Sequence, residues 1–399
     1  MIVAVSKKFL LEELELAAKW LGRETTKIEL RADGSGLSLR GSAVKRSAHL
    51  PLLPSRVLRT GTLTIDIDEL RRGVKAMPQG EFTLVVETSD DPRKRSHTVR
   101  LKTSERSVVL SGRLGGDPVA ELSLPSAVYA HLPLDVLREI AVRVVTAVSF
   151  EESRFQLQSA HFEHRRDQKL TTLDVCATDG HRLAHCRLAI PRESDRAAAW
   201  LPGEGEANVH GRILREIAGF EGLSGIETEL RWSPDEEIVG LVVDGRRFAH
   251  RSDDRTFPDW RRLVTHDYPL ALSVDRAALV DSMKAAALEV MAHVVSFTFT
   301  PNQPTVTISG WRRRGDPVYE DAIEFLSEPE EAVAFNINPR YVLEAAESFA
   351  PATTVLLELR PSKLGPEPEK VLDAIVFRPT GAVPQPYDLQ PLQLIMTWR

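Results

Sequence analysis

The chain has few cysteines and no long apolar segment. Its 399 residues include two cysteines, Cys176 and Cys186, which excludes the disulfide framework typical of small secreted domains. We expect two small, buried and reduced side chains, with a cross-hairpin pair as the alternative, because both cysteines flank one predicted turn. No run of about 18 uncharged apolar residues is present, which argues against a membrane-spanning helix.

Targeting and catalytic signals are also missing. The segment Met1–Lys8 has no charged region followed by a long apolar core, so we expect no secretory signal and a cytoplasmic location. There is no GxxxxGK[ST] phosphate loop and no GxSxG nucleophile elbow. We therefore expect no catalytic residues, no cofactor, no metal ion and no enzymatic activity.

The composition is that of a globular protein, with 42% hydrophobic and 27% charged residues. A chain of 399 residues is too long for one ordinary core and indicates two or three domains. The net charge of −6 disfavours a uniformly basic surface but leaves room for a local basic track.

The sequence predicts the same arrangement of helices and strands three times. The three copies begin about 130 residues apart, which is close to the usual domain size. Long amphipathic helices are expected at Ser6–Leu21, Pro133–Val148 and Asp275–Val290. Shorter helices are expected at Asp68–Met77, Asn208–Phe220 and Pro339–Phe349. Alternating strands are expected at Leu37–Ser42, Phe82–Glu87, Leu173–Gly180, Thr228–Trp232, Val306–Gly310 and Val355–Leu359.

This order predicts an α+β fold in which three tandem domains each place two helices on an antiparallel sheet. The expected domains are residues 1–124, 125–256 and 257–399, joined near Leu122–Ser126 and through Phe257-Pro258-Asp259-Trp260. Similar units joined head to tail tend to form an arc, and self-association can close an arc into a ring.

The polar faces of the predicted helices are rich in basic residues for an acidic chain. They carry Lys7, Lys8, Arg71, Arg72, Lys75, Arg138, Arg143, Arg212, Arg215, Arg276, Lys284 and Arg340. One interpretation is an ordinary solvated surface, because glutamates are interspersed among these residues. The other is a loose track that faces the phosphate backbone of duplex DNA without reading its sequence.

The most informative segment is Ala177-Thr-Asp-Gly-His-Arg-Leu-Ala184, in which Asp179-Gly180 predicts a hairpin turn between two strands. A metal site or a hydrolytic dyad at Asp179 and His181 was a candidate chemistry. His181 and His185 are four apart, but on a strand this spacing separates them by about 13 Å. A third ligand is not evident either, so neither role is expected.

This segment resembles the signature of the bacterial replicative sliding clamp, the beta subunit of DNA polymerase III. Ser149–Leu157, Thr256–Leu263 and Leu394–Arg399 are similar to further segments of the same family, in the same order. The resemblance implies a crescent of three domains that pairs head to tail into a homodimeric ring around duplex DNA. Such a ring is a non-catalytic processivity factor that serves a replicative polymerase, a clamp loader and repair proteins.

The resemblance also implies a pocket that receives a short peptide motif of these partners. Its residues would be Arg154, Leu157, Thr178, Gly180, His181, Arg182, Leu183, Pro258, Leu263, Met396, Trp398 and Arg399. The alternative for the leucines is an ordinary place in the core. Departures from the family pattern at Leu263, Thr397 and Trp398 predict a divergent member, and a paralogue that acts as a regulatory or decoy binding protein without encircling DNA is the alternative function.

Overall fold

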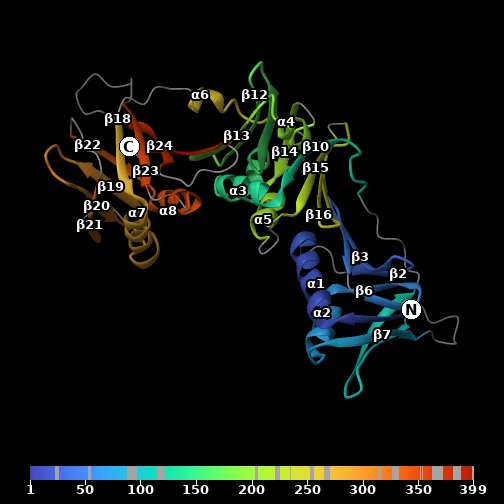
Figure 1. Cartoon of the computed structure of the whole chain (residues 1–399). Coiled ribbons are helices and arrows are strands. Elements are labelled where there is room, and N and C mark those ends of the chain that lie inside the picture. Colours follow the sequence, from blue (N-terminus) through green and yellow to red (C-terminus); the bar gives the residue numbers. More distant parts are fainter. Residues whose placement is uncertain are drawn as a thin grey trace. The chain divides into compact units, whose positions relative to one another are not determined.

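The structure is a computed structural model of the whole chain (Figure 1). It divides into two compact units, one made of Met1–Asp135 and Gly222–Asp253, the other of Val136–Glu221 and Asp254–Arg399. The structure describes residues 1–22, 27–52, 55–87, 97–114, 122–202, 205–220, 225–233, 235–251, 256–264, 270–312, 316–325, 332–350, 352, 354–361, 372–380 and 388–397. In those ranges no helix is long and apolar enough to cross a membrane.

A strand, a helix and three strands follow one another twice in each third of the chain. The first third contains β1 (Ile2–Ser6), α1 (Lys7–Leu21), β2 (Lys27–Asp33), β3 (Gly36–Ala43), β4 (Arg46–Leu52), the additional β5 (Ser55–Arg59), β6 (Gly61–Asp66), α2 (Ile67–Ala76), β7 (Glu81–Glu87), β8 (His97–Lys102) and β9 (Ser107–Leu114).

The middle third contains β10 (Val128–Pro133), α3 (Leu134–Val145), the 3₁₀ segment η1 (Glu152–Leu157), β11 (Ser159–Arg166), β12 (Leu170–Thr178), β13 (Arg182–Pro191), α4 (Asp195–Trp200), β14 (Gly205–His210), α5 (Gly211–Ala218), β15 (Glu227–Ser233), β16 (Ile238–Val243) and β17 (Arg246–Arg251). The last third contains α6 (Arg261–Val264), β18 (Leu270–Asp275), α7 (Arg276–Lys284), the π-helical turn η2 (Ala285–Glu289), β19 (Val294–Phe299), β20 (Thr305–Trp311), β21 (Tyr319–Glu324), β22 (Val333–Ile337), α8 (Pro339–Ser348), β23 (Thr354–Pro361), β24 (Leu372–Thr380) and β25 (Asp388–Met396).

The same pairing rule holds in every third. The strand before each helix pairs antiparallel with the first sheet strand after the other helix of that third. The pairs are β1 with β7 and β6 with β2, then β10 with β15 and β14 with β11, then β18 with β23 and β22 with β19. A repeat in both element order and strand pairing is stronger evidence for three similar domains than a repeat in helix spacing alone. The reason is that strand pairing fixes which residues share a sheet face.

Strands from neighbouring thirds are also hydrogen-bonded to each other. In the first unit β17 pairs with β4, which makes one sheet of 13 strands. In the second unit β13 pairs with β25 over Arg182–Ala189, inside a sheet of eight strands, and β19–β22 form a sheet of four. The α+β prediction with antiparallel sheets is confirmed.

The predicted helices are confirmed, and their caps explain where several of them begin. Asp66 accepts a hydrogen bond from the Glu69 N–H, and Asp275 accepts one from the Ala278 N–H, both at 2.8 Å. Ser6 makes no such side-chain bond. The Lys7 N–H, at the start of α1, donates to the carbonyl oxygen of Gly80 at 2.9 Å.

The ends of two predicted helices differ from expectation. Asn208 lies in β14, opposite His161 of β11, so α5 begins only at Gly211. The helix predicted to reach Val290 becomes π-helical at Ala285–Glu289. Apolar periodicity cannot detect either change, because it registers which face is buried and not which hydrogen bonds are made.

Cys176 and Cys186 are free and buried, as the first of the two alternatives predicted. The strand register pairs Cys176 with His185 and Val175 with Cys186, so the two thiols point to opposite faces of the sheet. Burial raises the pKa of the Cys186 thiol to about 12 and raises that of Cys176 well above its ordinary value.

Candidate functional site

The predicted turn connects β12 to β13 and is held by its own side chains. Asp179 Oδ1 accepts hydrogen bonds from the N–H groups of His181 and Arg182, at 2.9 and 3.1 Å. Thr178 Oγ1 donates to the Arg182 carbonyl at 2.7 Å and accepts from the Gly180 N–H at 3.1 Å. Gly180 has φ of 88°, a conformation that glycine adopts without strain.

These bonds also bear on the hydrolytic alternative. The second carboxylate oxygen of Asp179 accepts from Arg182 Nε at 3.0 Å. Both oxygens therefore hold the turn, and the contact with His181 is made by its backbone N–H and not by its ring. The hairpin is built as a rigid scaffold rather than as an acid–base pair.

Arg154 and Leu157 come from η1 and lie directly against this turn. Arg154 Nη1 donates to the carbonyl oxygen of Asp179 at 2.6 Å. A Cβ atom at Gly180 would lie 3.2 Å from Arg154 Nη1 and 4.0 Å from Leu157 Cδ1. The glycine thus permits both the turn and the close approach of η1.

Arg182 connects the hairpin to helix α8 of the last third. Its Nη1 donates to Glu344 at 2.5 Å, and its guanidinium lies 4.3 Å from the centre of the Tyr341 ring. Burial, with a smaller contribution from Asp179, raises the pKa of Tyr341. The side chain of Arg182 is only 10% exposed, so this contact is part of the packing.

The last strand closes the other side of the hairpin. Met396 donates its N–H to the carbonyl oxygen of His181 at 3.0 Å, and Ile395 pairs with Arg182. The Met396 side chain is 38% exposed. Trp398 and Arg399, two members of the expected pocket, lie outside the described residues.

Leu183 is a core residue. It is 1% exposed and belongs to a buried cluster with Cys176, Phe257, Trp260, Val376, Leu392 and Leu394. The core alternative is therefore correct for Leu183. Leu157 is also buried, whereas Leu263 is 43% exposed and Pro258 is exposed.

The segment Phe257–Trp260 has a role that its sequence did not reveal. Phe257 and Trp260 enter the same buried cluster, and their rings lie 5.2 Å from His161 and 4.6 Å from His185. The aromatic spacing in Phe-Pro-Asp-Trp was the available signal. The two aromatic rings anchor the segment between the middle and last thirds to β11 and β13.

Three of the predicted DNA-facing residues cap helices. Lys7 at the start of α1 donates to the carbonyl oxygens of Lys75 and Met77 at the end of α2. Arg138 of α3 donates to Ala218 O at the end of α5, and Arg276 of α7 donates to Ala346 O and Ala352 O at the end of α8. In each third a cation of the first helix neutralises the carbonyl end of the second.

Arg143 also differs from expectation, because it is buried and donates to Glu139 O of its own helix at 3.0 Å. A phosphate could not reach it without unpacking. The exposed members of the predicted set are Lys8, Arg72, Lys75, Arg138, Arg212, Arg215, Lys284 and Arg340. Arg71 is half-buried and pairs with Asp68, and Arg215 lies 3.8 Å from the centre of the Phe150 ring.

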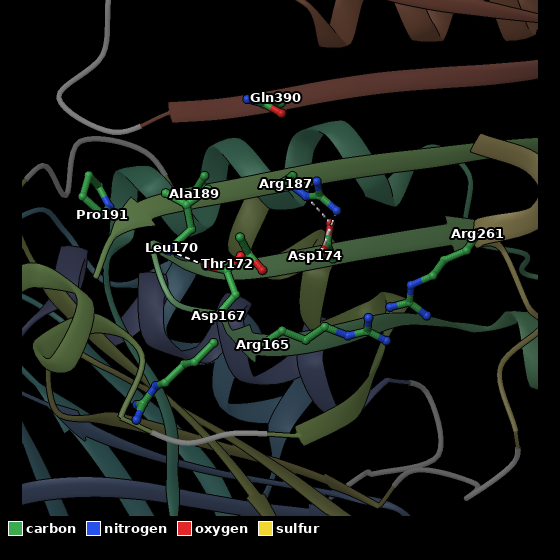
Figure 2. Close-up of a pocket in the computed structure, with 11 residues that line it drawn as sticks. Arg165, Asp167, Leu170, Thr172, Asp174, Arg187, Ala189, Pro191, Arg261 and Gln390 are labelled. Carbon is green, nitrogen blue, oxygen red and sulfur yellow. Dashed lines mark hydrogen bonds and ion pairs between the residues drawn. The ribbon is translucent and has the colours of Figure 1, made fainter. Parts of the chain in front are cut away.

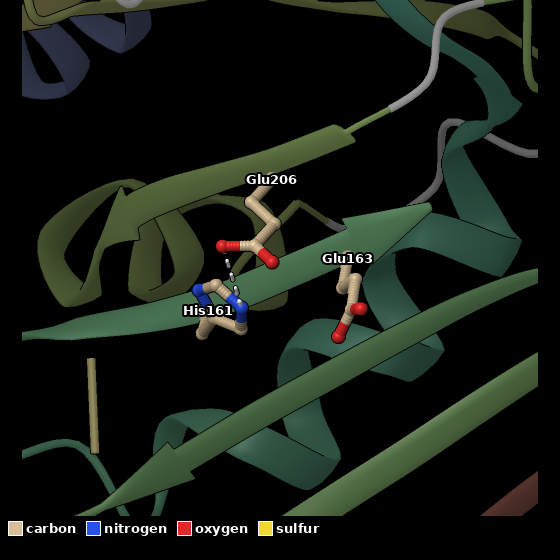
Figure 3. Close-up of side chains that lie close together, drawn as sticks. All are labelled: His161, Glu163 and Glu206. Atoms are coloured by element: carbon tan, nitrogen blue, oxygen red, sulfur yellow. Dashed lines mark ion pairs between the residues drawn. The ribbon is translucent and has the colours of Figure 1, made fainter. Parts of the chain in front are cut away.

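His161, Glu163 and Glu206 have ligand atoms within 4.8 Å of one another, the spacing that a metal ion needs (Figure 3). His161 Nδ1 lies 3.0 Å from Asn208 Oδ1, and its Nε2 lies 3.8 Å from Glu206. Glu163, however, is paired with both Arg165 and Arg261. Two guanidinium groups already neutralise this carboxylate, so the cluster is an ion-pair network that disfavours a cation.

The chain is similar along most of its length to curated beta sliding clamps. It is 22% identical over 347 residues to the beta sliding clamp of Synechocystis sp., a match that covers 85% of this chain and 84% of that protein. The beta sliding clamp of Synechococcus elongatus is 23% identical over 385 residues, covering 90% and 96%. No protein-family model matches the chain.

Solved structures of sliding clamps have the same fold over the whole chain. The DNA polymerase sliding clamp of Bacillus subtilis superposes with a TM-score of 0.79 at 18% identity, covering 100% of this chain and 99% of that one. The sliding clamp of Bartonella birtlesii bound to griselimycin gives 0.79 at 17% identity, with coverage of 100% and 99%. The predicted three-part clamp fold therefore agrees with experimental structures from end to end.

Proposed function

We infer that this chain, a divergent beta sliding clamp, encircles duplex DNA and tethers a replicative polymerase to it as a non-catalytic subunit. The thrice-repeated order and pairing of strands carries this inference, together with the match to curated clamps over 85% of the chain. A ring linked to DNA raises the effective concentration of its partner without gripping the DNA tightly. Because its partner is the chromosome, we place the protein in the cytoplasm.

The proposed domains are residues 1–124, 125–256 and 257–399. The recurrence of one pairing rule within each third supports these boundaries. A homodimer would contain six such thirds, and head-to-tail contact between two copies gives a closed assembly.

A surface of the last third suits this self-association. β21 is one of the two edge strands of its four-stranded sheet, and Tyr319 of β21 bonds to Ser282 of α7. Leu288 and Met291, just beyond α7, are 56% and 55% exposed. An unpaired strand edge beside exposed apolar side chains is a surface that another chain readily covers.

The proposed DNA contacts are the exposed helix cations named above, with Arg143 left out because it is buried. Lys7, Arg138 and Arg276 would add to the local positive potential while they cap helices. Such contacts would be independent of DNA sequence and sensitive to salt.

The proposed docking site for partner peptides is the β12–β13 turn with its neighbours. Arg154, Leu157, Thr178, Gly180, His181, Arg182 and Met396 are joined by the contacts described above. Pro258, Leu263, Trp398, Arg399 and the buried Leu183 complete the set that the family resemblance implies. The site would receive a polymerase, a clamp loader and repair proteins through one short motif.

The decisive experiment measures self-association and retention on DNA. Light scattering after size exclusion should give a dimer at submicromolar concentration. After loading onto nicked circular DNA, the protein should stay bound through a high-salt wash and should leave once the circle is linearised. A protein that remains monomeric and never stays on circular DNA would instead be the decoy or regulatory paralogue.

A paired substitution tests the proposed dimer surface. Leu288→Lys with Met291→Lys should yield monomers, because two charges would be desolvated at the contact. Val44→Lys is the matched control, since Val44 is 86% exposed at a turn in the other unit. Dimers that survive the double substitution would place the contact elsewhere.

A further inference from the structure

A cavity of about 540 Å³ lies on the sheet of the second unit, away from the docking hairpin (Figure 2). Its walls come from β11, β12 and β13, with Gln390 of β25 on the β13 side and Arg261 of α6, which is paired with Glu163, on the β11 side. Cavities of about 300–1,000 Å³ are the size at which small molecules bind proteins.

Arginines dominate the lining, which contains Arg165, Arg166, Arg187 and Arg261 against Asp167 and Asp174. Asp167 accepts hydrogen bonds from the N–H groups of Lys169 and Leu170, both at 2.7 Å, and so closes its own turn. Arg166 donates to the carbonyl oxygens of Leu201 and Pro202. The cavity therefore contains more positive than negative charge.

Two buried carboxylates beneath the lining hold the arginines in place. Glu163 is paired with Arg165 Nε and with Arg261. Asp174 accepts from Arg187 Nε at 2.8 Å and Nη2 at 3.3 Å, and it also bonds His185 at 2.7 Å. Burial opposes ionisation, yet the bonds from His185 and Arg187 keep the pKa of Asp174 below its ordinary value. Asp174 therefore remains charged near neutral pH.

Arg165 and Arg187 each use one edge of the guanidinium group on a buried acid and keep further N–H donors for the cavity. Arg165 and Arg187 are 59% and 45% exposed, and the described residues provide no partner for Arg165 Nη1 and Nη2 or for Arg187 Nη1. Figure 2 shows the guanidinium groups of Arg165 and Arg261 turned toward each other. The Glu163 carboxylate contacts both groups and neutralises part of their charge, so the exposed N–H groups of Arg165 and Arg187 are the ones that face the cavity.

The rest of the lining is neutral and in part apolar. Leu170, Ala189 and Pro191 form an apolar side, while Thr172 and Gln390 offer hydrogen bonds. A ligand that fits therefore has a strongly anionic part for the guanidinium forks and a flat, mostly apolar part beside it.

We propose that this cavity binds a small molecule that carries a chain of phosphates next to a ring system, the chemistry of a nucleoside polyphosphate. The phosphates would lie against the outward N–H groups of Arg165 and Arg187, and the nucleoside would lie against Leu170 and Pro191. The site is independent of DNA encirclement and of the hairpin, so its test does not depend on the proposed function.

The test is calorimetric titration of the full-length protein with ATP and, separately, with inorganic tripolyphosphate, in magnesium-free buffer. We expect saturable binding of one ATP per chain. Arg165→Gln and Arg187→Gln should each weaken it about tenfold or more, the effect of losing one charge-assisted hydrogen bond. Arg262→Gln is the matched control, because Arg262 follows Arg261 but is 84% exposed and outside the lining.

A second variant separates the two halves of the ligand. Leu170→Ala should weaken ATP but leave tripolyphosphate unchanged, because it removes only apolar contact. If Arg187→Gln fails to fold, the more exposed Arg165 carries the arginine test. The proposal is overturned if ATP does not bind saturably at millimolar concentration, if tripolyphosphate binds and ATP does not, or if the lining variants bind like Arg262→Gln.

Discussion

Arg182 donates to Glu344 at 2.5 Å, although 162 positions of sequence separate the two residues. The same guanidinium bonds Asp179 within its own hairpin and covers the Tyr341 ring. One side chain therefore fixes the docking hairpin and fastens it to helix α8.

We expect Arg182→Ala to lower the free energy of unfolding by about 2–3 kcal/mol, because the largely buried Asp179 carboxylate would lose its charged partner. Glu344→Gln should cost about 1 kcal/mol or less, since the Glu344 side chain is 43% exposed. Urea titrations of both variants provide the measurement. Equal losses of unfolding free energy in the two variants would mean that Arg182 stabilises the protein mainly through its contact with α8 and not through the hairpin.

The Gly180→Ala substitution probes the contact between the turn and η1. Its Cβ would lie 3.2 Å from Arg154 Nη1, at a positive φ. We expect a loss of about 1–2 kcal/mol in stability and weaker binding of a labelled peptide that carries the polymerase's clamp-binding segment. Gly205→Ala is the control, because Gly205 has φ of 104° with nothing within 4 Å of a Cβ. It should share the backbone cost and leave peptide binding intact.

Basic residues that cap helices and basic residues that contact DNA should respond differently to substitution: the first should affect stability, the second DNA binding. Arg276→Met removes a donor from the end of α8 and should lower unfolding free energy by about 1 kcal/mol. Arg340→Gln, at an exposed position, should leave stability unchanged. It should instead reduce the salt dependence of DNA binding, by about one in the slope of log K against log salt. DNA binding measured by anisotropy at several salt concentrations would contradict the proposed track if that slope did not change.

Stability should fall as the pH falls through the ordinary pKa of histidine. Burial lowers the pKa of His161 below the ordinary histidine value of 6.5, against opposing contributions from Asn208 and Glu206. The unfolded chain then binds a proton more readily than the folded chain, so the stability contribution is complete above pH 6.5 and is lost as the pH falls below it. The slope is at most about 1.4 kcal/mol per pH unit for one group.

Urea unfolding between pH 7.5 and 5 measures this dependence. His161→Gln should flatten the curve in that window. His293→Gln, at an exposed histidine, should leave it as in the parent protein. A dependence that is the same in all three proteins would assign it to other groups.

The sequence predicted the helices, six of the strands and the α+β class because these depend on local apolar periodicity. It did not predict the strands that precede each helix, such as β1 and β14, because short strands leave little periodic signal. The burial of Leu183 and Arg143 depends on contacts with Phe257 and Gln393, which are distant in sequence. The helix-capping roles of Lys7 and Arg276 likewise follow from tertiary packing, which makes a basic residue on a polar face indistinguishable from a DNA contact.

The pairing of β13 with β25, and of β17 with β4, joins neighbouring thirds through main-chain atoms. Every residue except proline offers the same N–H and C=O groups, so such a joint is largely indifferent to side-chain substitution. Evolution can therefore replace most of the surface and much of the core while the order of the thirds persists. Because main-chain pairing tolerates side-chain substitution, the fold can be shared over the whole chain although sequence identities are only near 22%.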